Sequence, residues 1–292
     1  MSNDRTGQVI ADRYRLVALI ERGGQSEVYR AQDLVGHDEV AVKVMSRNVA
    51  ADSLFRERMF REALAMANLA GTAAVRVLDQ RWTEDGALCL VMELLVGTDL
   101  EHYLGKLEAT GGHAEPRWLL ELFGPVVRTL EAAHAMGIVH RDLKPANVFV
   151  VDPSAGGGVR LLDFGFAKFV RMRGLTQPGH VAGSPSYIAP ETWQGRSHDI
   201  DHRVDVYSLG AVLFRALGGQ PPFVAKDLPE LLGLVTTAPR PSLHALRPDL
   251  PHLIDQWVVG ALAIDPEKRF QNVSALWNAL GRMLSRSPVD RP

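Results

Sequence analysis

A run of polar residues near the middle of the chain is the clearest chemical signal in the sequence. It reads His140-Arg-Asp-Leu-Lys-Pro-Ala-Asn147, and Asp163-Phe-Gly165 follows sixteen residues after Asn147. Lys43 lies earlier in the chain, and Ala189-Pro-Glu191 lies later. Carboxylate and amide oxygens are the ligands that Mg²⁺ prefers, and lysines supply positive charge. These residue types together could bind a hard cation and neutralise the charge of an anionic substrate.

The part of the chain before Gly97 predicts strands around one helix. Apolar residues alternate over 39–45, which places Val40, Val42 and Val44 on one face of a strand and Lys43 on the other. Further strands are predicted at 14–20, 28–31, 75–82 and 87–95, with turns at 21–26 and 84–86. Apolar residues at helical spacing predict a helix over 53–69.

The pattern changes to long helices after residue 97. An apolar stripe over 118–130 predicts a helix, in which Gly124-Pro125 predicts a kink or a break. Residues 204–217 predict a buried helix, and 270–284 predict a last amphipathic one. The predicted fold class is α+β, with one domain over 12–285. It comprises a small β-rich N-lobe at about 12–93, a hinge at about 93–97 and a larger helical C-lobe at about 98–285, between flexible ends at 1–11 and 286–292.

The composition excludes several classes of protein. Apolar residues make up 46% of the chain and charged residues 23%, which excludes wholesale disorder. A net charge of -2 offers no bulk attraction for nucleic acid, so we expect no nucleic-acid partner. The single cysteine, Cys89, excludes an intramolecular disulfide framework. No apolar stretch predicts a membrane span, and the polar start predicts a cytoplasmic chain; a piece of a longer receptor-type protein stays open as an alternative.

Lys43 and the motifs at 140–147, 163–165 and 189–191 resemble, in order, the signature set of the eukaryotic-type protein kinases. The resemblance covers about residues 12–285. The Lys-Pro pair that follows His140-Arg-Asp-Leu is similar to that of the serine/threonine branch. Ser26, which replaces the third glycine of the family's glycine-rich loop, resembles bacterial members. The resemblance implies a bilobal protein kinase fold. It also implies ATP with Mg²⁺, or Mn²⁺, as cofactors, and transfer of the γ-phosphoryl group to Ser/Thr hydroxyls of protein substrates, with autophosphorylation.

The resemblance also implies a role for each polar residue of the motifs. Asp142 would accept the proton of the substrate hydroxyl, and Lys144 would steady the transferred phosphoryl group. Lys43 would contact the α- and β-phosphates and pair with a carboxylate on the helix that follows. We assign this carboxylate to Glu62, because it shares the apolar face of that helix and Glu57 does not. The metal ligands would be Asn147 and Asp163.

The predicted nucleotide site departs from the family in its glycine-rich loop. The family pattern is Gly-x-Gly-x-x-Gly-x-Val, of which this chain keeps only Gly23 among the glycines, with Glu21 in the first place. The Glu21 carboxylate would lie near the nucleotide. Alignment on the connector makes Met92 the gatekeeper and Glu93 and Leu95 the backbone contacts of adenine. The full predicted nucleotide set is Gly23, Gly24, Ser26, Val28, Ala41, Lys43, Met92, Glu93, Leu95 and Asp99, the last of these for the ribose hydroxyls.

Residues 163–191 resemble the activation segment of the family. Thr176 is the best acceptor for a regulatory phosphate, which Arg141 would receive, although an unmodified loop threonine is an equal alternative. Ser184 would bond Asp142 and Lys144, and substrate preference would lie around Ser184 and in the helix after Pro222. Three structural roles are also implied: packing for His140 and Phe164, backbone anchoring for Asp205, and a buried bridge between Glu191 and Arg269.

Besides an active protein kinase, we consider two other functions and one protein partner. A pseudokinase that binds nucleotide or acts as a scaffold is the main alternative, and Glu21 is the residue that favours it. Small-molecule kinases of the same fold lack the Ala189-Pro-Glu191 segment, which is present here. Arg13, Leu34 and Asp79 resemble positions by which some bacterial kinases form a weak homodimer through the N-lobe.

Overall fold

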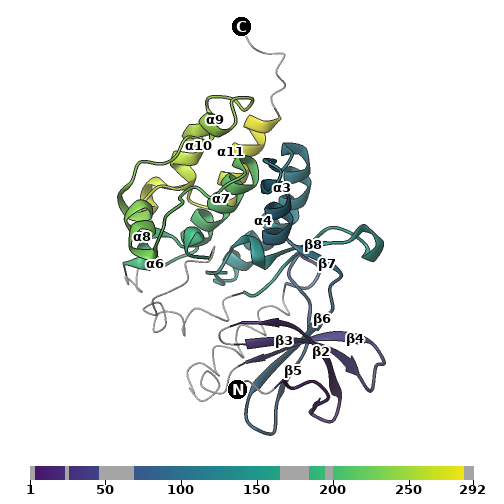
Figure 1. Ribbon diagram of the computed structural model, residues 1–292. Helices are drawn as coiled ribbons and strands as arrows, with labels where there is room; N and C mark the ends of the chain where they lie inside the picture. Colours follow the sequence, from purple (N-terminus) through teal and green to yellow (C-terminus); the bar gives the residue numbers. More distant parts are fainter. Residues whose placement is uncertain (1–3, 24–25, 46–68, 165–183, 195–199, 286–292) are drawn as a thin grey trace. The chain divides into compact units, whose positions relative to one another are not determined.

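The computed structural model describes residues 4–23, 26–45, 69–164, 184–194 and 200–285. This part of the chain divides into two compact units, the first ending at Gly97 and the second beginning at Thr98 (Figure 1). The predicted helix over 53–69 lies outside the described residues except for its last position, as do Glu62, Gly24 and Thr176. Within the described ranges no helix has the length and apolar character needed to cross a membrane.

The first unit is built on a six-stranded antiparallel sheet. Its strands are β1 (Val9–Ile10), β2 (Tyr14–Arg22), β3 (Ser26–Asp33), β4 (Glu39–Met45), β5 (Val77–Trp82) and β6 (Leu88–Glu93), in the order β1-β2-β3-β4-β6-β5. Val40, Val42 and Val44 join one buried cluster with Tyr14 and Tyr29. Because side chains alternate along a strand, Lys43 leaves β4 on the other face, as the sequence predicted.

Two sequence predictions for this unit are wrong in detail. The predicted turn at 21–26 is shorter, because β2 continues to Arg22, which pairs with Glu27 through a 3.0 Å ion pair. The predicted flexible end at 1–11 instead includes β1 and contacts the sheet through Arg5 and Ile10. Ile10 is only 1% exposed, and the Tyr29 hydroxyl accepts a hydrogen bond from the Arg5 backbone. Ile10 is thus buried on an edge strand, β1, that was not predicted.

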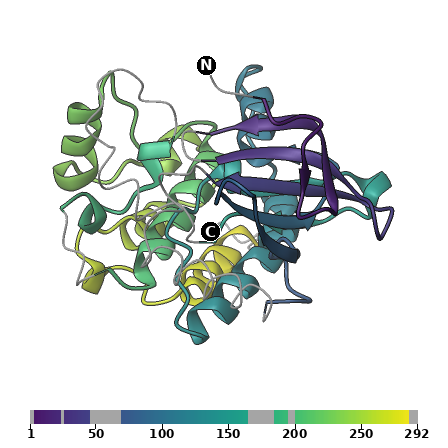
Figure 2. The same cartoon turned by 90° about the horizontal axis from the view of Figure 1, so that it is seen from below.

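The second unit is mainly helical (Figures 1 and 2). Its α-helices are α3 (Leu100–Glu108), α4 (Pro116–Ala135), α6 (Pro190–Trp193), α7 (Arg203–Gly218), α8 (Leu228–Thr237), α9 (Leu243–Leu246), α10 (Ile254–Ala261) and α11 (Val273–Leu284). A small sheet contains β7 (Gly97–Asp99), β8 (Val148–Val151) and β9 (Val159–Leu161). Short 3₁₀ turns are η1 (Pro145–Asn147), η2 (Pro153–Ala155), η3 (Ser184–Tyr187) and η4 (Pro266–Lys268).

Helix α7 is the centre of this unit, and its predicted burial is confirmed. Every residue from Val204 to Leu217 is buried, and the helix packs against α10 and α11. Gly210 permits the close approach to α10, because a Cβ atom there would lie 2.9 Å from the Ala261 Cβ. A buried helix of this kind is a rigid support for groups that bind to it.

Two helices differ from their predictions. Of the two outcomes predicted for Gly124-Pro125, a kink or a break, the break is wrong. Helix α4 runs through Pro125, because Phe123, Val126 and Val127 on its buried face are at most 3% exposed and hold both halves in one core. Helix α11 begins at Val273 rather than near residue 270. The Asn272 side chain caps it by accepting a 2.7 Å hydrogen bond from the Ala275 backbone.

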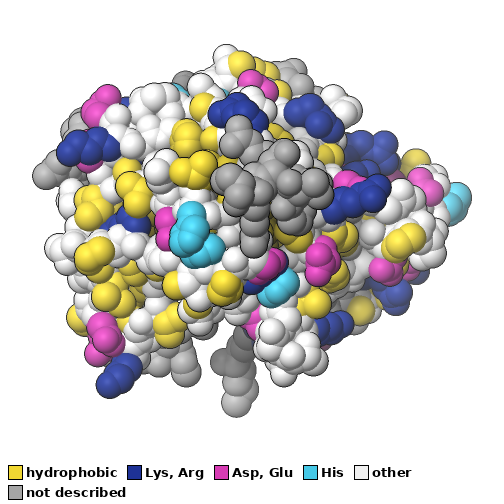
Figure 3. All heavy atoms as spheres, turned by 90° about the horizontal axis from the view of Figure 1, so that it is seen from above, with side chains coloured by type: hydrophobic (Ala, Val, Ile, Leu, Met, Phe, Trp, Pro, Cys, Tyr) yellow, Lys and Arg dark blue, Asp and Glu magenta, His cyan; other side chains and the backbone are white. Residues whose placement is uncertain are grey.

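The surface of the molecule carries charges of both signs. On the face shown in Figure 3, acidic and basic side chains lie intermixed, and hydrophobic side chains form small separate groups. This mixture agrees with the net charge of -2. A broad single-sign field is therefore not a feature of this face.

Candidate active site

The predicted catalytic residues of the second unit lie together in the loop before β8. Lys144 Nζ donates to Asp142 Oδ2 at 2.9 Å. Asn147 Nδ2 donates to the Asp142 backbone oxygen at 2.7 Å and to its Oδ2 at 3.1 Å. The Asp142 side chain is 13% exposed and that of Lys144 17% exposed. A carboxylate, an ammonium group and an amide thus form one half-buried polar cluster.

Asp205 on α7 holds the backbone of this loop. It is fully buried, and its carboxylate accepts hydrogen bonds from the backbone N–H groups of His140 and Arg141, both at 2.7 Å. His134 Nε2 lies 2.8 Å from the same carboxylate. Burial alone would raise the pKa of Asp205, but these hydrogen bonds outweigh it and the pKa is lowered, so the group stays ionised. The predicted anchoring role of Asp205 is confirmed, and it supports the left-handed backbone of Arg141, with φ 62°.

His140 serves packing rather than proton transfer. Its ring lies 4.7 Å from that of Phe164, and Nε2 bonds the Leu162 carbonyl at 2.8 Å. The Asp142 N–H donates to His140 Nδ1, so Nε2 carries the proton of a neutral ring. Burial lowers the pKa of His140, which also favours the neutral form. The predicted packing of His140 and Phe164 is therefore confirmed.

The two predicted metal ligands lie on neighbouring segments. The Leu162 N–H donates to the Asn147 carbonyl at 2.8 Å, and Asp163 follows directly with a left-handed φ of 54°. Within the described ranges no cluster of three His, Cys, Asp or Glu side chains could hold a metal alone. Mg²⁺ usually takes one or two protein oxygens together with substrate phosphates. An amide and a carboxylate at this place fit that donor set.

The predicted nucleotide residues of the first unit follow three adjacent strands. In the register of the sheet, Val28 pairs with Lys43, which pairs with Leu90. Ala41, two residues before Lys43 on β4, pairs with Met92. Lys43 is 7% exposed on this strand. The sheet thus places the predicted phosphate lysine on the same face as three other residues of the predicted nucleotide set: Val28, Ala41 and Met92.

The ends of this surface are shaped by backbone hydrogen bonds. The Gly23 N–H donates to the Ser26 carbonyl at 2.9 Å, which closes the turn between β2 and β3. Glu93 at the end of β6 exchanges two bonds with Arg76, one from its backbone N–H at 3.0 Å and one to its carboxylate at 2.9 Å. Leu95 follows beyond the strand, so β6 ends two residues earlier than predicted.

Asp99 has a structural function besides the predicted ribose contact. Its side chain caps α3 by accepting a 2.9 Å hydrogen bond from the His102 backbone, and its Oδ2 lies 2.6 Å from His102 Nδ1. The signal was present, because aspartate directly before a helix is a preferred N-cap. The ribose contact at Asp99 stays a prediction.

The end of the predicted activation segment is fixed by a buried bridge. Arg269 donates to the two carboxylate oxygens of Glu191 at 2.8 and 3.0 Å, as predicted. Ser184 is the first residue of η3, and its side chain is not among the described parts of the structure. Arg141 Nε is buried and has no hydrogen-bond partner in the described chain. A buried guanidinium edge of this kind is suited to an anionic group, as predicted for Arg141.

Two of the three predicted dimer residues, Arg13 and Asp79, form side-chain contacts within the chain. Arg13 makes a bidentate pair with Asp33 at 2.8 and 2.7 Å. The Asp79 carboxylate accepts from the Tyr14 hydroxyl at 2.8 Å and pairs with Arg81 at the same distance. These contacts explain the residue types at Arg13 and Asp79 without a second copy of the chain, so the dimer is not supported.

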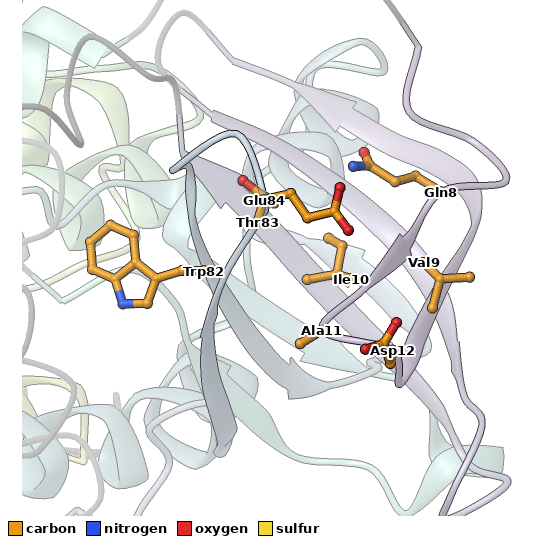
Figure 4. Close-up of a pocket in the computed structure, with 8 residues that line it drawn as sticks. All are labelled: Gln8, Val9, Ile10, Ala11, Asp12, Trp82, Thr83 and Glu84. Carbon is orange, nitrogen blue, oxygen red and sulfur yellow. The ribbon is translucent and has the colours of Figure 1, made fainter.

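A small pocket in the first unit lies apart from the predicted site. It has a volume of about 170 Å³ and is lined by residues 8–12 and 82–84, none of which the sequence analysis selected (Figure 4). The Glu84 side chain extends toward Ile10, whereas the Trp82 ring points away from both (Figure 4). Its lining residues supply no group for the predicted chemistry.

Comparison with known proteins identifies the family. The chain matches the protein kinase domain over residues 14–277. It is 36% identical over 293 residues to the serine/threonine-protein kinase PknB of Mycolicibacterium smegmatis, covering 98% of this chain and 45% of that protein. With the serine/threonine-protein kinase PknH of Mycobacterium tuberculosis it shares 35% identity over 277 residues, covering 95% and 43%.

Solved structures agree with the sequence comparison. The kinase domain of Mycobacterium tuberculosis PknI is 28% identical, with a TM-score of 0.75, over 96% of this chain and 99% of that one. The chain spans less than half the length of the curated relatives it matches, 45% for PknB. The bilobal kinase fold predicted from the motifs is confirmed, and the chain belongs to the protein kinase family, among relatives of the bacterial serine/threonine type.

Proposed function

We propose that this chain transfers the γ-phosphoryl group of ATP to serine or threonine hydroxyls of protein substrates. The observation that carries the proposal is the cluster of Asp142, Lys144 and Asn147, in which a carboxylate is held by a cation and an amide. Asp142 accepts the proton of the attacking hydroxyl, and Lys144 offsets negative charge at the transferred group. Asn147 and Asp163 are the residues that would hold Mg²⁺, which neutralises phosphate charge when bound.

The intact set of residues favours an active enzyme over a pseudokinase. The lysine, the base and both metal ligands are present at Lys43, Asp142, Asn147 and Asp163. In regulation, we propose that Thr176 accepts a phosphate that Arg141 receives, and that Ser184 contacts the base. This assignment is supported by Arg141 Nε, which is buried and has no hydrogen-bond partner among the described residues. We also retain the cytoplasm as the proposed location of this domain.

A labelling experiment tests the proposed function. The purified chain is incubated with Mg²⁺, γ-labelled ATP and casein as a generic acceptor, with the Asp142→Asn variant beside it, and the modified sites are mapped. We expect label on serine or threonine with the wild type alone, including Thr176 on the chain itself. Nucleotide binding without any transfer would support the pseudokinase instead.

Glu21→Gly is expected to tighten nucleotide binding. Glu21 is an exposed residue of β2 opposite Val28, and it stands in the first place of the predicted glycine-rich loop. Glu21 carries the same sign of charge as the ATP phosphates, and removal of one such exposed charge is worth about 0.2–1 kcal/mol. The Kd for ATP should therefore fall by roughly 1.4-fold to fivefold. A fluorescence titration measures this. Glu21→Gln serves as the control that removes charge without adding glycine freedom, and an unchanged Kd in both variants would contradict the prediction.

A further inference from the structure

A buried arginine at the end of α7 connects three separate parts of the second unit. The Arg215 side chain is 7% exposed. Its Nη1 donates to the Glu101 carboxylate at 2.8 and 2.7 Å and to the Tyr187 hydroxyl oxygen at 2.8 Å. Its Nε and Nη2 donate to Glu108 at 2.7 and 3.0 Å. One guanidinium therefore ties α7 to both ends of α3 and to η3.

Tyr187 is held to α7 at two atoms. Its hydroxyl binds Arg215, and its backbone oxygen accepts a 2.7 Å hydrogen bond from Ser208 Oγ. Ser208 and Arg215 are seven residues apart, which places them two turns apart on one face of the helix. Tyr187 is only 2% exposed, and this burial raises the pKa of its hydroxyl, which therefore stays neutral. These two contacts fix the position of the Tyr187 ring against α7.

The fixed position of Tyr187 matters for the segment around it. Ser184, three residues earlier, is the predicted contact of the catalytic base. Glu191, four residues later, is fixed by Arg269. The segment 184–191 is thus attached at two points, and the Tyr187 contact is the one nearer to the predicted substrate position.

We propose that Arg215 is a positioning residue for the protein substrate, which it aligns by holding the Tyr187 hydroxyl and, through it, the segment 184–191. The inference rests on the proposed kinase function and names no new reacting group. The planar guanidinium suits this task, because it presents several N–H donors in a fixed fork. Glu101 and Glu108 compensate its charge, which allows the arginine to be buried beside a neutral hydroxyl.

Steady-state kinetics of Tyr187→Phe test the proposal. The variant keeps the buried ring and removes the hydroxyl alone. The acceptor is the peptide that the wild type phosphorylates fastest from a library with serine or threonine at the centre. We expect the KM for this peptide to rise about tenfold, the lower range for loss of a hydrogen bond to a charged group, while kcat and the KM for ATP change less than about twofold.

A matched control removes a hydroxyl that Arg215 does not bind. Tyr103 lies on α3 and stacks on Trp118 with ring centroids 4.6 Å apart, so Tyr103→Phe should leave the KM for the peptide unchanged. Arg215→Lys, combined with Tyr187→Phe, completes a double-mutant cycle. If both residues act through one contact, the tyrosine change adds nothing in the lysine background.

The outcomes separate this proposal from the proposed function. A tenfold higher KM for the peptide in Tyr187→Phe, absent in Tyr103→Phe and not additive with Arg215→Lys, supports the positioning role. An active wild type with an unchanged KM in Tyr187→Phe, or additive effects in the cycle, overturns this inference alone. A wild type that transfers no phosphoryl group to any peptide overturns the proposed function and this inference with it.

Discussion

Asp142→Asn is expected to lower the rate of phosphoryl transfer by about 10²- to 10⁴-fold and to leave the Kd for ATP within about twofold. The asparagine amide has no basic oxygen of comparable strength, so the proton of the acceptor hydroxyl has no receiver. Its carbonyl oxygen can still accept from Lys144 and Asn147, which bind the Asp142 carboxylate at 2.9 and 3.1 Å. The loop should therefore keep its shape while the reaction loses its base.

The measurement compares single-turnover transfer with an equilibrium titration of ATP on the same protein. Asp152→Asn is the matched control, because Asp152 is an exposed residue just beyond β8 and undergoes the same chemical change. Normal turnover in Asp142→Asn would remove Asp142 from the role of base. Equal losses of turnover and of ATP affinity would point instead to a collapsed nucleotide site.

The catalytic cluster could be predicted from sequence because its members are neighbours in the chain. Asp142, Lys144 and Asn147 fall within one loop, so their meeting needs little information from the rest of the fold. Asp205 is more distant, and its role came from the resemblance rather than from spacing. The structure shows why such a residue is needed: two successive backbone N–H groups of the loop are buried and require an acceptor.

Contacts between distant segments were the part that the sequence could not supply. Arg215 lies 28 residues from Tyr187 and 114 residues from Glu101, and each residue type is ordinary at its own position. Only the packing of α3, α7 and η3 makes them one cluster. Pro125 shows the same limit for local rules, because the apolar face of α4 outweighs the helix-breaking preference of proline.

Glu191→Gln is expected to destabilise the second unit by about 3–5 kcal/mol, the usual effect of removing one partner from a buried ion pair. Arg269 is 3% exposed, and its other hydrogen bonds go to the Ala263 and Arg203 carbonyls, which carry no charge. The glutamine would leave a buried cation without a counter-charge. At about 2–4 °C per kcal/mol, the melting temperature should fall by roughly 6–20 °C.

The comparison with two further variants identifies the cause of that loss. Glu267→Gln removes a carboxylate whose side chain is 75% exposed and which pairs with Arg203 at 2.8 Å, so its effect should stay below about 1 kcal/mol. Glu191→Leu combined with Arg269→Met replaces both charges by apolar groups and should recover much of the stability, because no unpaired charge remains. A thermal melt of Glu191→Gln that matches the wild type would show that the Arg269 charge is satisfied by carbonyls alone. The bridge would then align the segment 184–191 without stabilising the fold.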